Sequence, residues 1–260
     1  MTEYATLDFD QAGSIARIVL NRPADANGMN DAMTRELADV ARRCDATATK
    51  VVLLTATGRF FCAGGDLKAM ASSPLGPGPY VKGIADDLHR AISTFARMDA
   101  VLITAVNGVA AGAGFSLAMT GDLVIAAESA SFTMAYTRAG LSPDGSSSYF
   151  LPRLIGVRRT QELMLTNRRL SAREALDWGL ITEVVPDVDL VARTDALATE
   201  MSAGARESGS AVKKLLLTTF GNGLEEQMEI EGRLIASCAA GADGREGIDA
   251  FLAKRAARFA

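Results

Sequence analysis

Short apolar runs and helically spaced apolar residues alternate along the first half of the chain. Thr6–Phe9 and Ile15–Leu20 flank a turn at Gly13, a pattern that predicts a β-hairpin. Apolar side chains three and four positions apart predict helices over Asp31–Cys44 and Tyr80–Met98. Further short apolar runs predict three buried strands, at Val51–Thr55, Val101–Val106 and Asp122–Ala127.

From Ser146 onward the pattern is almost wholly helical. Glycine and proline predict interruptions of this helical part at Pro152, Gly156, Gly179–Val185 and Gly221–Gly223. Ser72–Pro79, rich in proline and glycine, predicts a flexible or lid-like loop. Strand–loop–helix units thus precede a helical part, which is an α/β organisation. The best internal boundary is Pro186–Asp189, so we divide the chain into a core at 1–186 and a helical region at 187–260.

The composition is that of a folded globular protein of 260 residues, with 48% hydrophobic and 22% charged residues. The net charge of −4 disfavours a dedicated nucleic-acid-binding protein. No apolar run approaches the roughly 20 residues needed to cross a bilayer, so we predict no membrane partner. The N-terminal segment does not have the pattern of a signal peptide, and we expect the protein in the reducing cytoplasm.

Metal-ligating residues are scarce. The three cysteines, Cys44, Cys62 and Cys238, are far apart and form no CxxC motif, and His89 is the one histidine of the sequence. Structural zinc and sites built on several imidazoles are therefore excluded, and we predict no metal.

Two glycine-rich turns, Thr57–Asp66 and Asn107–Gly114, each follow a predicted buried strand and lead toward a helix. Exposed backbone N–H groups at such a point attract negative charge. A dinucleotide-binding turn is disfavoured because Leu117 replaces the third glycine, and a nucleophile elbow around Ser116 lacks its final glycine. For one turn alone, close helix–strand packing would suffice as an explanation. Two turns whose N–H groups converge would instead form an oxyanion hole.

The segments Phe61–Lys68 and Ala105–Gly114 resemble the two signature turns of the crotonase (enoyl-CoA hydratase/isomerase) superfamily. The resemblance extends from about Tyr4 to Phe259. It implies a spiral of ββα units with a helical C-terminal oligomerisation region, assembled as a trimer or a dimer of trimers. Further segments carry it: Asn21-Arg-Pro, Asn27, Gly121–Ala127, Ala175–Leu180 and Glu246–Arg255.

The resemblance also implies an acyl-CoA thioester as substrate, with coenzyme A as part of the substrate and no tightly bound cofactor. By motif position, the backbone N–H groups of Ala63 and Ala113 would form the oxyanion hole. The positions that match coenzyme A contacts are Arg22, Ala24, Asp66 and Lys68, together with Phe251 and Lys254 from a neighbouring subunit. A solvated surface role is the alternative for each charged residue, and Asp66 is also a candidate helix cap.

The chain departs from the hydratase pattern at the two catalytic glutamates, whose positions hold Ser116 and Tyr136. A different carboxylate, Asp144, lies on a Pro-Gly turn. An aspartate there is often only a turn or N-cap residue. However, Asp144 is similar in position to the catalytic aspartate of 1,2-epoxyphenylacetyl-CoA isomerase-like enzymes. One carboxylate suffices to move a proton between two carbons, so we favour an enoyl-CoA isomerase over a two-glutamate hydratase.

The role of His89 differs between the alternative functions predicted for this site. It is either a partly buried helix residue or, as in the 4-chlorobenzoyl-CoA dehalogenases that the chain also resembles, a base that works with Asp144 as nucleophile. Tyr136 replaces the tryptophan of those enzymes. Thioester hydrolysis by the same pair, and acyl-CoA or RNA binding without turnover, stay open as alternatives, with RNA disfavoured by the net charge.

Overall fold

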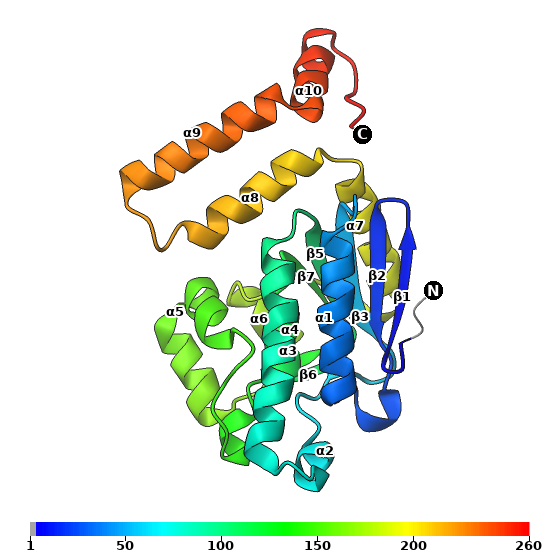
Figure 1. Ribbon diagram of the computed structural model, residues 1–260, viewed down its shortest axis with the longest axis vertical. Coiled ribbons are helices and arrows are strands. Elements are labelled where there is room, and N and C mark those ends of the chain that lie inside the picture. The colour runs from blue at the N-terminus through cyan, green and yellow to red at the C-terminus, as the bar shows by residue number, and fades with distance from the viewer. Residues whose placement is uncertain (1–3, 260) are drawn as a thin grey trace.

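A six-stranded sheet forms the centre of the computed structural model, which describes residues 4–259 (Figure 1). The order of its strands is β1-β2-β3-β5-β7-β10. Strand β1 pairs antiparallel with β2, and each later neighbour is parallel. The strands are β1 (Leu7–Ala12), β2 (Ile15–Leu20), β3 (Val51–Ala56), β5 (Val101–Val106), β7 (Leu123–Ala127) and β10 (Glu183–Val185). The predicted hairpin and the α/β class are confirmed.

Four shorter strands form a second sheet in the order β4-β6-β8-β9. They are β4 (Phe60–Cys62), β6 (Val109–Ala111), β8 (Ser131–Thr133) and β9 (Leu170–Ser171). Three of them directly follow strands of the larger sheet along the chain: β4 follows β3, β6 follows β5 and β8 follows β7. Each pair leads into helical structure, so the repeated ββα unit implied by the resemblance is present.

The sequence-based assignment missed the short strands. Both glycine-rich turns contain one, β4 and β6, and the supposed helix break at Gly179–Val185 contains β10. A strand of three residues is too short for an alternating pattern to be recognised. Pro152 also lies within a helix, and the kink falls at Gly156, whose φ is 77°.

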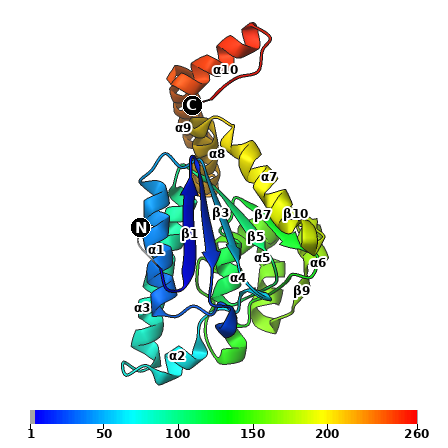
Figure 2. The ribbon, with the colours of Figure 1, turned by 90° about the vertical axis from the view of Figure 1, so that its right-hand side faces the viewer.

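Helices cover both faces of the larger sheet (Figure 2). The α1/α3 pair lies on one face, and α7 packs its buried Leu190 and Leu197 on the other. The loop predicted at Ser72–Pro79 is confirmed only for residues 73–76, because α2 ends at Ser72 and α3 begins at Pro77, a residue suited to the first helical turn. The helices of the core are α1 (Asp31–Asp45), α2 (Leu67–Ser72), α3 (Pro77–Arg97), α4 (Ala113–Ala118), α5 (Ser147–Thr166), α6 (Ala172–Asp177) and α7 (Leu190–Ser202).

The last three helices, α8 (Arg206–Thr218), α9 (Leu224–Ala240) and α10 (Ala242–Leu252), project from the core in Figure 1. Helix α8 is tied to the core by Lys213, whose Nζ donates to the carbonyls of Phe95 at 2.9 Å and Ala100 at 2.7 Å. The same Nζ lies 2.8 Å from Asp122 Oδ2. Burial raises the pKa of the Asp122 carboxyl, and Lys213 opposes that rise. The division at residue 186 stays a prediction. Helix α7, which follows residue 186, packs on the larger sheet.

Replacing Lys213 by methionine is expected to lower the free energy of unfolding by about 3 kcal/mol, because Asp122 and two carbonyls lose their buried partner. Urea unfolding measures the change. Lys214→Met is the matched control: Lys214 pairs with Asp99 at the surface, where an ion pair contributes less than about 1 kcal/mol. Equal losses in both variants would contradict a special role of the buried lysine.

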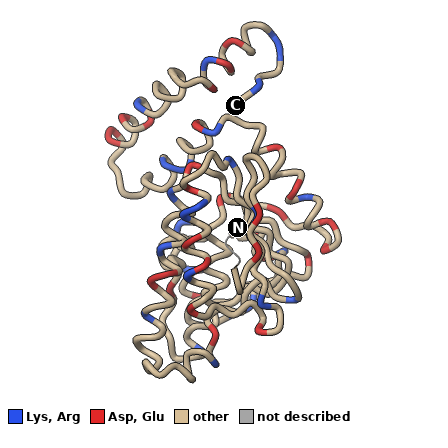
Figure 3. Tube along the Cα trace, turned by 45° about the vertical axis from the view of Figure 1, so that its right-hand side comes forward, with Lys and Arg blue, Asp and Glu red and all other residues tan. Residues whose placement is uncertain are grey.

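No helix among residues 4–259 is long and apolar enough to cross a membrane. Figure 3 shows acidic and basic residues interspersed along the chain. On α1 and α3, oppositely charged pairs such as Arg35–Asp31 and Lys82–Asp86 are four positions apart. Oppositely charged side chains at this spacing stabilise a helix slightly.

Candidate active site

The two glycine-rich turns meet in space, and glycine is required where they touch. A Cβ on Gly64, whose φ is 96°, would lie 2.9 Å from the Ala111 carbonyl oxygen and 3.3 Å from the Ala113 nitrogen. A Cβ on Gly114 would lie 2.2 Å from the Cys62 carbonyl oxygen. The carboxyl end of β4 therefore lies directly against the start of α4, as the convergence of the two turns predicts.

Gly114→Ala is expected to lower the free energy of unfolding by about 2 kcal/mol or more, because the new methyl group would overlap the Cys62 backbone. Gly83→Ala is the matched control. Gly83 also lies in a helix, α3, but has open space around its Cα, so alanine there is expected to stabilise by about 0.5–1 kcal/mol. Thermal unfolding of both variants tests the contrast, and a harmless Gly114→Ala would contradict the close approach.

One of the two predicted N–H donors is already paired within the chain. The Ala63 N–H donates to the Ala26 carbonyl at 3.0 Å and so is already used, which corrects the expectation for Ala63. The N–H of Gly65 has no acceptor within the described part of the chain, although both neighbouring residues bond to Met29. Ala113 is the first residue of α4, where an N–H has no intrahelical partner, so its assignment as a donor still stands as a prediction.

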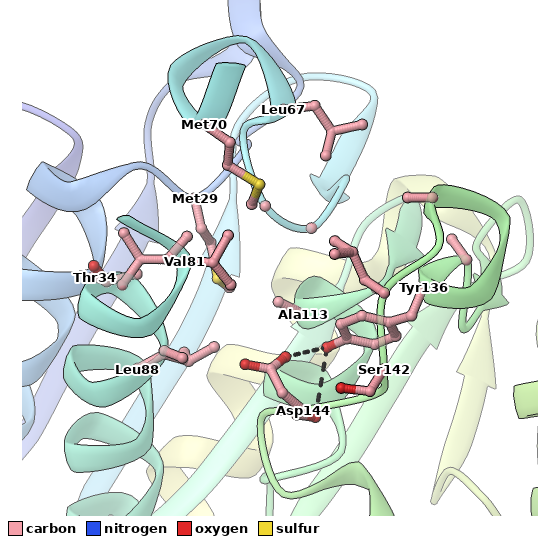
Figure 4. A pocket seen from close by; sticks show the side chains of 18 of the residues that line it. Met29, Thr34, Leu67, Met70, Val81, Leu88, Ala113, Tyr136, Ser142 and Asp144 are labelled. Carbon is pink, nitrogen blue, oxygen red and sulfur yellow. Dashed lines mark hydrogen bonds between the residues drawn. The ribbon is translucent and has the colours of Figure 1, made fainter. Parts of the chain in front are cut away.

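A cavity of about 380 Å³ opens beside these donors and is predominantly apolar (Figure 4). It lies between the glycine-rich turns, α2, α3 and the segment around η2 (Tyr136–Ala139). Its apolar side chains include Met29, Leu67, Met70, Val81, Ile84, Leu88 and Leu141. Few polar side chains line it, chiefly Thr34, Lys82, Tyr136, Ser142 and Asp144. A cavity of this kind suits an apolar acyl group.

The carboxylate of Asp144 points into this cavity rather than capping a helix. In Figure 4 it lies between Leu88 and the Tyr136 hydroxyl, which donates to Asp144 Oδ1 at 2.6 Å. No N–H of α5 donates to the Asp144 side chain in the described structure, so the N-cap alternative is wrong; the backbone carbonyl of Asp144 accepts the Ser147 hydroxyl at 2.9 Å instead. The geometry leaves Oδ2 without a comparable donor.

Ser116 and Tyr136, the residues at the two glutamate positions, support Asp144. The Ser116 hydroxyl donates to the Asp144 carbonyl at 2.9 Å, and its oxygen lies 3.1 Å from the Tyr136 hydroxyl. Burial and the neighbouring Asp144 carboxylate raise the pKa of Tyr136, so this hydroxyl stays protonated and donates. The two replacements therefore hold one carboxylate in place instead of supplying two.

His89 lies close to Asp144 but does not line the apolar cavity. Its Nε2 accepts the Gly145 N–H at 3.2 Å and lies 3.5 Å from Asp144 Oδ2. The imidazole lines a second cavity, between α3, α5 and α8. His89 therefore lies on a helix, as predicted, and it also lies close to Asp144, as the dehalogenase alternative requires.

The predicted coenzyme A residues fall into three groups. Arg22 and Asp66 form an ion pair at 3.2 Å. The Asp66 side chain also accepts the Ala69 N–H at 3.0 Å, so Asp66 is the N-cap of α2, as the alternative predicted. Ala24 and Lys68 are exposed.

Phe251 and Lys254 are exposed at the far end of the molecule, beyond the projecting α9 (Figure 1). They therefore lie away from the apolar cavity of their own chain. This is compatible with the prediction that they serve a neighbouring subunit.

Sequence reasoning missed two structural contributors to the site. Gly65 supplies the unpaired N–H, and the signal available was the pair of consecutive glycines. Asn27 is fully buried: its side chain accepts the Arg22 N–H and donates to the carbonyls of Thr57 and Phe60. It clamps the segment after β2 onto the first glycine-rich turn. Among residues 4–259, no group of three or more histidine, cysteine or acidic side chains is placed to hold a metal.

Comparison with known proteins identifies the family. The family model described as enoyl-CoA hydratase/isomerase matches residues 10–260. The chain belongs to this family. Within it, the chain is 37% identical to the 1,2-epoxyphenylacetyl-CoA isomerase of Escherichia coli over 94% of each sequence. It is 38% identical to a Rhodobacter capsulatus protein named "Probable enoyl-CoA hydratase", over 98% of each.

The fold comparison agrees with the family assignment. The crystal structure of an enoyl-CoA hydratase from Bacillus anthracis superposes with a TM-score of 0.92 at 31% identity, covering 98% of this chain and 99% of that one. The family assignment thus makes a coenzyme A thioester consistent with the apolar cavity.

Proposed function

We propose that this family member isomerises the double bond of an enoyl-CoA thioester, with Asp144 as its single acid/base. The observation that carries the proposal is the pair Tyr136–Asp144: one carboxylate, oriented by a 2.6 Å hydrogen bond, in a cavity that is otherwise apolar. Ser116 and Tyr136 cannot provide the two carboxylates of a classical hydration. The similarity to the Escherichia coli isomerase supports the same choice.

The reaction would proceed in two proton transfers. The thioester oxygen would accept the N–H groups of Gly65 and Ala113, which would stabilise the negative charge of the dienolate. Asp144 would remove a proton from one carbon of the acyl chain and return it to another. No proton is gained or lost overall, so one carboxylate completes the cycle.

Substrate binding and assembly form the second part of the proposal. The coenzyme A moiety would lie along Arg22, Ala24, Asp66 and Lys68, with Phe251 and Lys254 of a neighbouring subunit closing over it. Helices α8–α10 and the turn between α8 and α9 carry exposed apolar side chains, including Leu216, Phe220, Leu224, Ile235 and Ile248. Covering them in a trimer or a dimer of trimers would account for that exposure.

Turnover of a substrate panel tests the reaction. The protein is incubated with 3-enoyl-CoA and 2-enoyl-CoA thioesters of increasing chain length, and products are followed by ultraviolet absorbance and mass. Interconversion of 3-enoyl and 2-enoyl isomers is expected to exceed hydration. Binding of the thioesters without isomerisation, and without exchange of the α-proton in heavy water, would instead support a binding protein.

A second candidate, hydrolytic dehalogenation of an aryl-CoA, is favoured by the 3.5 Å approach of His89 to Asp144. In that reaction Asp144 would attack the ring and His89 would activate water. Two contacts weaken it: Tyr136 already donates to Asp144 Oδ1, and the Gly145 N–H occupies His89 Nε2. Release of chloride from 4-chlorobenzoyl-CoA would decide in its favour.

A further inference from the structure

Two cavities follow one another along the same face of α3. The apolar cavity of the candidate site is lined by Ala85 and Leu88 of this helix. The second cavity, of about 330 Å³, is lined by His89, Ile92 and Ala96. Residues three and four positions apart share one face of a helix, so these five residues form a single stripe. At a rise of about 1.5 Å per residue, the stripe is roughly 16 Å long.

His89 forms the partition between the two cavities. Its Nε2 accepts the Gly145 N–H at 3.2 Å, which joins α3 to the turn that carries Asp144. The other side of this turn is filled, because a Cβ on Gly145 would lie 2.8 Å from Ser116 Cβ and 3.6 Å from Ile92 Cδ1. An alkyl chain that passed from the first cavity into the second would therefore have to displace the imidazole.

The acyl chain of the proposed substrate would point toward this partition. Its thioester oxygen would lie at the N–H groups of Gly65 and Ala113. A Cβ on Gly65 would overlap the terminal methyl group of Met70, so Met70 marks the donor end of the first cavity. In Figure 4, Met70 lies at one end of this cavity and Asp144 at the other. Because the carbons that exchange a proton must lie beside Asp144, the carbons beyond them would extend toward His89.

The second cavity has the lining that the end of an alkyl chain needs. Its apolar walls come from α3, α5 and α8, through Ile92, Ala96, Phe150 and Leu217. Its rim is open to water, since the His89 side chain is 49% exposed. An alkyl chain that entered this cavity would be buried in part.

We propose that His89 is a specificity-determining residue: it separates the apolar cavity from the second one and so sets the longest acyl chain that the site can bury. The inference rests on the proposed function for the placement of the thioester, and not for the reaction. A chain that ends before the imidazole is buried along its whole length. A longer chain must leave its end in water or break the contact between His89 and Gly145. Removal of the imidazole would connect the two cavities.

Calorimetric titration of saturated acyl-CoA thioesters, from butanoyl-CoA to dodecanoyl-CoA, measures this chain-length limit without turnover. For the wild-type protein, the affinity is expected to rise with each added methylene up to one chain length and then to stop rising. For His89→Ala, the rise is expected to continue over at least two further methylenes, by about two- to threefold each. The gain stays below the roughly fourfold of complete burial because the second cavity opens to water.

Three further variants separate the blocking of the passage from other roles of His89. His89→Phe refills the partition with a ring and is expected to keep the wild-type limit. Ala96→Phe, added to His89→Ala, fills the second cavity and is expected to remove the gain. Ser93→Ala, which lies on the rim of the second cavity and outside the partition, is expected to leave the limit unchanged.

An unchanged limit in His89→Ala would overturn the inference. So would an extended limit in His89→Phe, because a ring at this position would then not close the passage, and so would a gain that survives Ala96→Phe. His89→Ser repeats the test if the alanine variant does not fold. A wild-type protein that binds none of these thioesters would instead refute the substrate placement of the proposed function, and binding without isomerisation of the enoyl-CoA panel would refute the proposed reaction alone.

Discussion

Asp144→Asn is expected to lower kcat for enoyl-CoA isomerisation by about 10³-fold or more, while the thioester still binds. Asparagine keeps the shape of the side chain and still accepts the Tyr136 hydroxyl, which donates to Oδ1 at 2.6 Å. It cannot take up the proton that the reaction moves. Steady-state kinetics on a 3-enoyl-CoA measure the loss of turnover, and titration of the thioester measures binding.

Tyr136→Phe is the control that separates orientation from proton transfer. It removes the hydrogen bond but leaves the carboxylate in the cavity, so its loss of kcat is expected to be clearly smaller than that of Asp144→Asn. A loss as large as that of Asp144→Asn would assign the main proton transfer to Tyr136. Unchanged turnover in Asp144→Asn would refute a single-carboxylate mechanism.

Ala113→Pro is expected to lower kcat by about 10²–10³-fold, the usual effect of losing one oxyanion-hole donor. Ala113 is the first residue of α4, a position where the fixed φ of proline fits a helix and only the N–H is lost. The preceding residue is Gly112, which has the conformational freedom that a residue before proline needs.

Ala113→Gly is the matched control, because it changes the side chain at the same position and keeps the N–H. Its kcat is expected to stay within about tenfold of the wild-type value, since main-chain donors tolerate small side chains. Thermal unfolding of both variants shows whether α4 is intact. If Ala113→Pro folds and isomerises at the wild-type rate, the thioester oxygen does not lie at this helix start.

Local pattern was sufficient for the longer elements. The strand Val101–Val106 has the predicted bounds, and the helix predicted over Asp31–Cys44 begins at Asp31 and ends one residue later, at Asp45. An apolar run of six residues and helically spaced apolar residues are both long enough to specify what is buried. The three-residue strands β4, β6 and β8 could not be predicted in this way. They pair with one another in a separate sheet, and such pairing depends on segments that are about 20 to 50 positions apart.

The candidate site, like the fold, was predicted only in part from the sequence. The absence of two glutamates and the presence of Asp144 on a Pro-Gly turn are properties of the sequence alone, and they direct the choice toward an isomerase. Whether Asp144 caps a helix or faces a cavity was open until its contacts with Tyr136 and the backbone of α5 were known. The oxyanion-hole donors could not be assigned from the sequence alone. The Ala63 N–H donates to the Ala26 carbonyl, and the Gly65 N–H has no acceptor in the described part of the chain.

The sequence by itself therefore determined the family, the two turns and the small set of side chains that could perform chemistry. The tertiary structure alone decided which N–H groups remain unpaired, which oxygen of Asp144 is engaged, and that His89 reaches that carboxylate from across the chain. The physical reason is that a hydrogen bond acts over about 3 Å, whereas its partners here are as many as 56 positions apart. Residue types determine which contacts are possible, and only the packing of distant segments selects among them.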